Sequence, residues 1–164
     1  SISRILLILP IIYLIFIGNT FFSLVIFSLA GLTDFLDGYV ARLMRQETIL
    51  GANLDLLADK IFICTISIFL AFHFDNLIVL LSAILITSRE LTIGIARNFY
   101  LEINKVNELK VNLFGKLKTF LQISSLGFAL IFLESKYDYV AEILILLSSI
   151  ISWISLINYI SDKK

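Results

Sequence analysis

Residues 49–74 read ILGANLDLLADKIFICTISIFLAFHF, a polar start with two aspartates followed by a long apolar run. A helix of about 20 mostly apolar residues is long enough to cross a bilayer. Of the 164 residues, 59% are hydrophobic and only one is Pro, whereas soluble domains are about half apolar. Similar apolar stretches occupy residues 1–20, 21–41, 76–97, 115–133 and 139–160. We therefore predict an all-α integral membrane bundle of six transmembrane helices, forming a single domain over residues 1–164.

The basic residues fall almost entirely on one side of this predicted bundle. Six spans place both chain ends, and the loops near residues 42–49 and 98–114, on the same side of the membrane. Of the 13 Lys and Arg residues, only Lys136 falls on the opposite side. Cytoplasmic loops carry the excess of Lys and Arg, so we predict a multi-pass protein of the cytoplasmic (inner) membrane with its active site facing the cytoplasm. No basic-aromatic pattern indicates a nucleic-acid partner.

Four aspartates, Asp34, Asp37, Asp55 and Asp59, lie at the ends of two consecutive predicted helices. Charged residues within membrane helices are costly, and by default they mark a functional site. At about 100° per helical residue, each pair of aspartates shares one helix face. Four ionised carboxylates in a low-dielectric site require protons or cations to neutralise them. An all-oxygen ligand set suits hard ions, so we predict that these residues bind a divalent metal, Mg²⁺ or Mn²⁺, as two ions.

Small residues and one arginine accompany the aspartates. Gly38, Ala41 and Gly51 remove side-chain bulk from the same helix faces, so that a ligand or a neighbouring helix can approach the backbone. Arg42 supplies a planar set of donors suited to phosphate. The alternative interpretation is a set of buried ion pairs and packing glycines. The repeated helical spacing of so many such residues favours a ligand site.

These residues follow the pattern Asp-x2-Asp-Gly-x2-Ala-Arg-x8-Gly-x3-Asp-x3-Asp from Asp34 to Asp59. In this respect the chain resembles the CDP-alcohol phosphotransferase family. The resemblance implies six transmembrane helices, usually a homodimer, and metal-dependent attack by an alcohol on a CDP-linked substrate with release of CMP. It implies that the four aspartates bind the metals and that Asp59 is also the base for the acceptor hydroxyl. The residues that it assigns to the CDP pocket are Asp37, Gly38, Ala41, Arg42 and Gly51.

Two further segments resemble one bacterial branch of that family. They are Arg89-Glu90 followed by Arg97, and the run GKLKT at residues 115–119. This branch transfers the phosphatidyl group of CDP-diacylglycerol to sn-glycerol 3-phosphate. The resemblance therefore implies these two substrates, and membrane lipids, as the partners of the chain.

The nature of the acceptor can also be considered from charge. Glycerol 3-phosphate brings a phosphate into a site that already holds carboxylates and a pyrophosphate, so it requires several Arg or Lys donors. The candidates are Lys60, Arg89, Arg97, Lys116 and Lys118. Glu90 and Arg97 are seven residues apart and share a helix face, so we expect them to position each other. Cations at helix ends also set topology and extend to the membrane surface, which is the alternative role for each of these residues.

Other functions satisfy part of the same pattern. Inositol phosphate or phosphatidylglycerol as the acceptor fits the charge argument equally well, and serine is a further acceptor for the same chemistry. Carboxylates that face each other within a helix bundle also suit a divalent-cation transporter. A transporter does not account for Gly38, Arg42 or the basic residues of the later helices, because fixed positive charge near a cation path raises its barrier. Nucleotide-dependent release of CMP separates the enzyme from the transporter.

Overall fold

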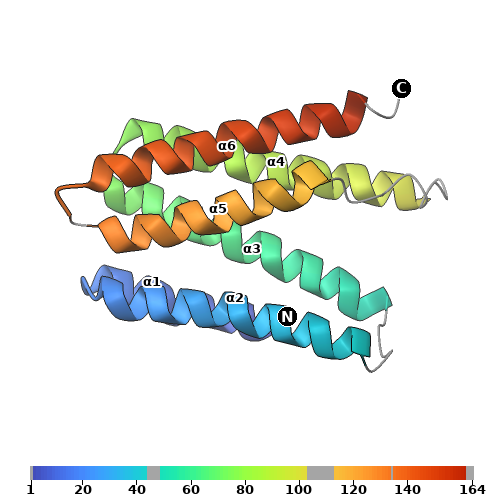
Figure 1. Ribbon diagram of the computed structural model, residues 1–164, viewed down its shortest axis with the longest axis horizontal. Helices are drawn as coiled ribbons and strands as arrows, with labels where there is room; N and C mark the ends of the chain where they lie inside the picture. The colour runs from blue at the N-terminus through green and yellow to red at the C-terminus, as the bar shows by residue number, and fades with distance from the viewer. Residues whose placement is uncertain (1, 44–48, 103–112, 134, 162–164) are drawn as a thin grey trace. The chain divides into compact units, whose positions relative to one another are not determined.

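The computed structural model describes six α-helices, and no strand is present in the described backbone, which covers residues 2–43, 49–102, 113–133 and 135–161 (Figure 1). Side chains are described at residues 4–33, 54, 56–96, 118–133 and 135–158. The helices are α1 Ile2–Phe16, α2 Thr20–Leu43, α3 Ile49–Phe74, α4 Leu77–Glu102, α5 Leu113–Phe132 and α6 Asp138–Ser161. The predicted class, an all-α membrane bundle of six helices, is confirmed.

The helix bounds agree with the apolar stretches of the sequence to within two residues, except that α1 ends at Phe16, before the predicted end at residue 20, and that α4 runs past its predicted end. The predicted and observed limits of α3 are the same, residues 49–74. By contrast, α4 continues to Glu102, beyond the predicted end at Arg97. The apolar pattern ends near residue 97, but residues 98–102 contain neither Gly nor Pro to interrupt a helix.

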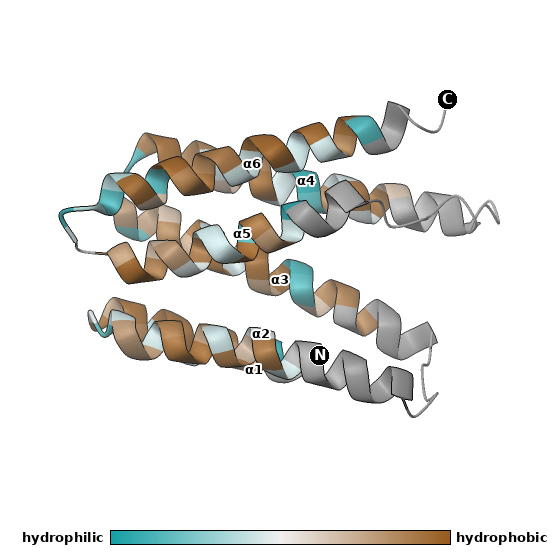
Figure 2. Cartoon of the chain, in the orientation of Figure 1, coloured by the Kyte–Doolittle hydropathy of each residue, from teal (hydrophilic) through white to brown (hydrophobic). Residues whose placement is uncertain are grey.

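The described helices have the composition of membrane spans. Three segments are long and apolar enough to cross a bilayer, namely Leu56–Phe74, Leu77–Ala96 and Asp138–Asn158. Shorter apolar helical segments are Arg4–Phe16, Thr20–Thr33 and Lys118–Phe132. Large apolar side chains face outward, as with Phe16 (78% exposed) and Phe72 (83% exposed). In Figure 2, brown, the colour of hydrophobic residues, runs along the described parts of all six helices. Extensive exposed apolar surface of this kind is matched by lipid, so the chain is a multi-pass membrane protein.

The chain divides into two compact units, and the first covers residues 1–69. Within it α1 and α2 pack side by side, with Ile11 and Ile15 fully buried (Figure 1). The turn between them contains Gly18 at φ 75°, a left-handed conformation that glycine adopts readily. Phe27 of α2 stacks on Phe62 of α3 with ring centroids 5.5 Å apart. These contacts join the first three helices.

The second unit covers residues 70–164, in which α6 packs against both α4 and α5. Asn76, before α4, accepts a hydrogen bond from the Ile78 amide (2.8 Å) and donates one to Glu142 of α6 (2.6 Å). Further along the same interface, the Trp153 indole donates to the Leu85 carbonyl of α4 (2.9 Å). The α4–α6 contact is therefore fixed at two levels by polar bonds. The single domain over residues 1–164 stays a prediction.

Candidate active site

The predicted metal and CDP residues lie in two helical segments of the first unit. Positions 34–42 belong to the last turns of α2, and positions 51–59 belong to the first turns of α3. Because the backbone is helical at both places, positions 34 and 37 share one face of α2, and positions 55 and 59 share one face of α3. The side chains lie outside the described residues at Asp34, Asp37, Gly38, Ala41, Arg42, Gly51 and Asp55. The metal site and the CDP pocket therefore stay predictions.

Asp59 is the one metal-motif aspartate whose side chain is described, and it forms an ion pair with Arg4 of α1. The Asp59 side chain is 48% exposed, so its carboxylate is accessible to a ligand, whereas that of Arg4 is 4% exposed. A buried guanidinium requires a partner, and here α1 supplies the cation while α3 supplies the carboxylate. Lys60, the next residue of α3, is partly buried. An oxygen donor in this position fits the hard cation expected from the motif.

Sequence reasoning did not identify Arg4 as a site residue. Arg4 is one of the basic residues predicted on the cytoplasmic side, and it belongs to the opening segment Ser1–Arg4, which also resembles the bacterial branch, but neither observation predicts a role for it in the site. One feature of the sequence does point to Arg4. It is an arginine at the start of an apolar helix, and the intramembrane aspartates of the same chain require cations as partners. The partner could not be named, because the spacing of residues within one helix carries no information about contacts with another helix.

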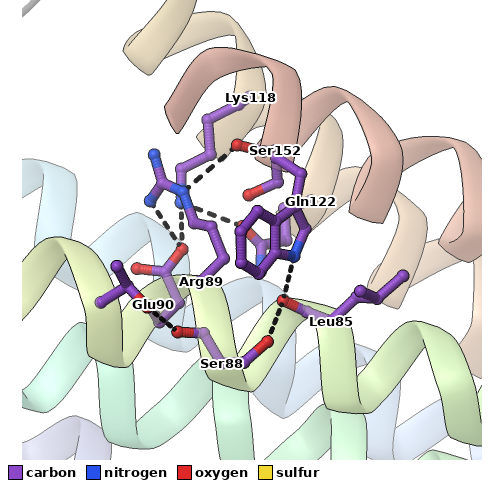
Figure 3. A network of polar contacts seen from close by, with 9 residues as sticks. Leu85, Ser88, Arg89, Glu90, Lys118, Gln122 and Ser152 are labelled. Atoms are coloured by element: carbon purple, nitrogen blue, oxygen red, sulfur yellow. Dashed lines mark hydrogen bonds and ion pairs between the residues drawn. The ribbon is translucent and has the colours of Figure 1, made fainter. Parts of the chain in front are cut away.

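Two of the predicted acceptor residues, Arg89 of α4 and Lys118 of α5, meet in the second unit (Figure 3). Both bond to the same oxygen of Glu90, with Arg89 Nη1 at 3.0 Å and Lys118 in a direct ion pair. Arg89 Nε also donates to the Ser152 carbonyl of α6 (3.3 Å), and Lys118 donates to Gln122 Oε1 (3.2 Å). Three helices thus contribute to one buried polar cluster, which we call the α4–α6 charge cluster: Arg89, Glu90, Lys118, Gln122 and Ser152.

The remaining predicted acceptor residues are not brought into this cluster by the described contacts. The side chains of Arg97 and Lys116 lie outside the described residues, and Lys60 belongs to the first unit. The predicted pairing of Glu90 with Arg97 is likewise untested. The described partners of Glu90 are Arg89, its neighbour in sequence, and Lys118, 28 residues away.

Counted over its five residues, the charge cluster carries one excess positive charge, and it has spare hydrogen-bonding capacity. Two cations face one carboxylate, and all three side chains are almost fully buried. Gln122 Nε2 and Ser152 Oγ are buried and have no hydrogen-bond partner among the described residues. The amide of Gln122 is oriented by Lys118, which bonds to its oxygen and leaves the NH₂ group as a donor. A buried cationic cluster with unused polar groups can bind an oxyanion such as phosphate.

Replacement of Lys118 by Met is expected to destabilise the protein, because it removes a buried charge-assisted bond to Glu90 while preserving side-chain length. We expect a loss of roughly 1.5–3 kcal/mol in the free energy of unfolding. Thermal or denaturant unfolding in detergent measures it. Lys136→Met in the α5–α6 loop is the matched control, since that lysine is exposed and should change stability by less than about 0.5 kcal/mol. Equal losses in the two variants would contradict a stabilising role for the cluster.

Comparison with known proteins adds an independent finding. The family model for CDP-alcohol phosphatidyltransferase matches residues 1–159. The CDP-diacylglycerol–glycerol-3-phosphate 3-phosphatidyltransferase of Wigglesworthia glossinidia brevipalpis is 37% identical over 148 residues, 90% of this chain and 81% of that protein. The proteins of the same name from Haemophilus influenzae and Shigella flexneri are 33% and 30% identical, over 93% of this chain and 82% and 84% of their own lengths. The range matched by the family model, residues 1–159, spans both the aspartate motif and the charge cluster.

Proposed function

Because this chain belongs to the CDP-alcohol phosphatidyltransferase family, we propose that it transfers the phosphatidyl group of CDP-diacylglycerol to sn-glycerol 3-phosphate. The products are phosphatidylglycerol phosphate and CMP, and the reaction belongs to phospholipid biosynthesis. The names of the similar proteins contain both substrates. Family membership also decides against the transporter hypothesis, since it makes the chain a transferase.

The observation that most directly supports an anionic acceptor is that two buried cations, Arg89 and Lys118, are held together by the single carboxylate of Glu90. Among the described residues, two buried cations face one carboxylate, and the excess positive charge is unfavourable unless further negative charge is supplied. An acceptor that carries a phosphate supplies that charge. A neutral or cationic acceptor alcohol would bring no net negative charge.

The chemistry assigned to the chain's own residues is proton transfer and charge stabilisation. The acceptor hydroxyl oxygen attacks the phosphorus that carries diacylglycerol, and the bond from this phosphorus to the oxygen of CMP breaks. Asp59 takes the hydroxyl proton as the bond forms, and Arg42 stabilises the negative charge that develops on CMP. Positioning and electrostatics of this kind account for most catalysis of phosphoryl transfer.

The remaining assignments follow the family resemblance. Asp34, Asp37, Asp55 and Asp59 would hold Mg²⁺ or Mn²⁺, as two ions, which would offset the charge of the pyrophosphate. Asp37, Gly38, Ala41, Arg42 and Gly51 form the CDP pocket. The residues assigned to the acceptor phosphate are Lys60, Arg89, Arg97, Lys116 and Lys118.

The setting of the reaction is also part of the proposal. The lipid chains of CDP-diacylglycerol stay in the bilayer of the cytoplasmic membrane while the reaction takes place at its cytoplasmic face. The distribution of Lys and Arg along the sequence supports this orientation. The enzyme works as a homodimer, as the resemblance to the family implies.

The proposal is tested with the detergent-purified protein, CDP-diacylglycerol and Mg²⁺ or Mn²⁺. Labelled glycerol 3-phosphate, inositol phosphate, serine and phosphatidylglycerol are offered in turn, and labelled product and CMP are measured. We expect label to enter new lipid only with glycerol 3-phosphate. Product from another acceptor would retain the chemistry and replace the substrate. Folded protein that releases no CMP with any acceptor would contradict the proposal.

A further inference from the structure

Glu90 is bonded to both of the buried cations that we assign to the acceptor phosphate. Its Oε1 accepts a hydrogen bond from Arg89 Nη1 and forms the ion pair with Lys118. Its side chain is 7% exposed, so the carboxylate acts inside the helix bundle and not at its surface. One oxygen therefore connects a cation of α4 to a cation of α5.

Each cation has a second anchor on a different group. Arg89 is held through Nε by the Ser152 carbonyl of α6, and Lys118 is held by Gln122 one turn along α5. These bonds use Nε and Nη1 of Arg89, and no side chain or carbonyl of the described residues bonds to Nη2. The guanidinium is thus fixed in orientation while one of its donor groups stays available to a ligand. Lysine has a long flexible stem, so fixed contacts are required to hold its ammonium group in one place.

The charge of Glu90 is unfavourable for a site that binds an anion. By simple electrostatics, a carboxylate beside two cations weakens their attraction for phosphate. The presence of Glu90 beside the two cations is explained if the benefit of holding them in a fixed geometry exceeds the loss of attraction for phosphate. Donor groups that are already ordered before the ligand arrives increase its affinity, because binding then costs less side-chain conformational entropy.

We propose that Glu90 is a positioning residue that holds Arg89 and Lys118 as a preformed pair of donors for the phosphate of the acceptor, an inference that rests on the proposed function. The unpartnered atoms of the cluster support it independently. Gln122 Nε2 and Ser152 Oγ belong to the residues that anchor Lys118 and Arg89, and both lack a partner among the described residues. The cluster therefore has an unfilled requirement for hydrogen-bonding atoms next to each cation.

The test is Glu90→Gln, which keeps the shape of the side chain and removes its charge. If Glu90 positions the cations, the KM for glycerol 3-phosphate rises by roughly tenfold, which corresponds to about 1.4 kcal/mol, and the KM for CDP-diacylglycerol stays within about twofold. If Glu90 only neutralises charge, the KM for glycerol 3-phosphate falls. A fall, no change, or an equal rise in both KM values would overturn the proposal.

Glu142→Gln is the matched control. Glu142 is also a carboxylate at the α4–α6 interface, but it bonds to Asn76 and not to the charge cluster. We expect this variant to lose thermal stability while both KM values stay at the wild-type level. A rise in the KM for glycerol 3-phosphate in the control equal to that in Glu90→Gln would assign the effect to general loosening of the interface and overturn the proposal.

A second variant covers the case in which Glu90→Gln does not fold. Glu90→Asp keeps the charge and withdraws the carboxylate by one methylene, and the inhibition constant of inorganic phosphate against glycerol 3-phosphate is measured. Positioning predicts weaker inhibition in Glu90→Asp, and unchanged inhibition would overturn the role of Glu90. Wild-type protein that makes no lipid from glycerol 3-phosphate would instead overturn the proposed function, so the two failures are distinguishable.

Discussion

Asp59→Asn is expected to reduce the rate of CMP release by roughly 10²–10⁴-fold, the range for loss of a general base, while the protein stays folded. The asparagine has the shape of the aspartate but cannot take a proton from the acceptor hydroxyl, and it is a poorer metal ligand. The Asp59 side chain is about half exposed, so its replacement removes little buried structure. Its amide oxygen can still accept a hydrogen bond from the buried Arg4. CMP release and thermal unfolding, measured on the same preparation, check this expectation.

The matched control for this variant is Asp75→Asn. Asp75 is exposed in the turn that follows α3 and has φ 46°, a left-handed conformation that asparagine tolerates. The same chemical change at this position should leave turnover unaltered. Near-normal turnover in Asp59→Asn would remove the assignment of Asp59 as the base. Loss of turnover in both variants would show that the substitution acts on the protein in general.

Removal of divalent metal is expected to abolish turnover completely. The four motif aspartates and a pyrophosphate carry like charges, so without cations the nucleotide is repelled from the site that should bind it. EDTA should bring CMP release to background, and added Mg²⁺ or Mn²⁺ should restore it. Persistent turnover in EDTA, with trace metal excluded, would contradict the predicted metal site.

The variants Asp34→Ala and Asp37→Ala separate metal binding from a general loss of activity. Both should weaken binding of CDP and of the metal together, as measured by calorimetry on the folded protein. The reason is that the bound metal offsets the charge of the pyrophosphate, and the pyrophosphate oxygens in turn help to bind the metal. Unchanged affinity for CDP in both variants would show that these aspartates and the nucleotide do not share a site.

The fold could be predicted from the sequence because the length and apolar composition of the segments determine it. The stretch at residues 49–74 was predicted with both of its ends correct. The end of α4 was wrong because the prediction followed hydrophobicity, whereas helix propensity continues after the apolar run stops. Fixed spacing also identified the aspartate motif, since all its residues lie within two adjacent helices.

The contacts between distant helices could not be predicted in the same way. Glu90 was expected to pair with Arg97 because seven residues make two helical turns, and its described partners include Lys118 on a different helix. Likewise, Arg4 was placed by sequence on one side of the membrane, but its contact with Asp59 depends on how α1 packs against α3. Periodicity determines the face of a helix. The neighbour that occupies that face depends on tertiary packing.

The bond between Trp153 and the Leu85 carbonyl has a consequence for spectroscopy. The chain contains one tryptophan, and it follows Ser152, whose carbonyl holds Arg89. Its indole N–H is bonded across the α4–α6 interface. Indole emission depends on local polarity and hydrogen bonding, so the tryptophan fluorescence of this protein, excited selectively over its six tyrosines, arises next to the charge cluster. The enzyme thus carries a built-in optical reporter for ligands that bind there, and no label has to be introduced.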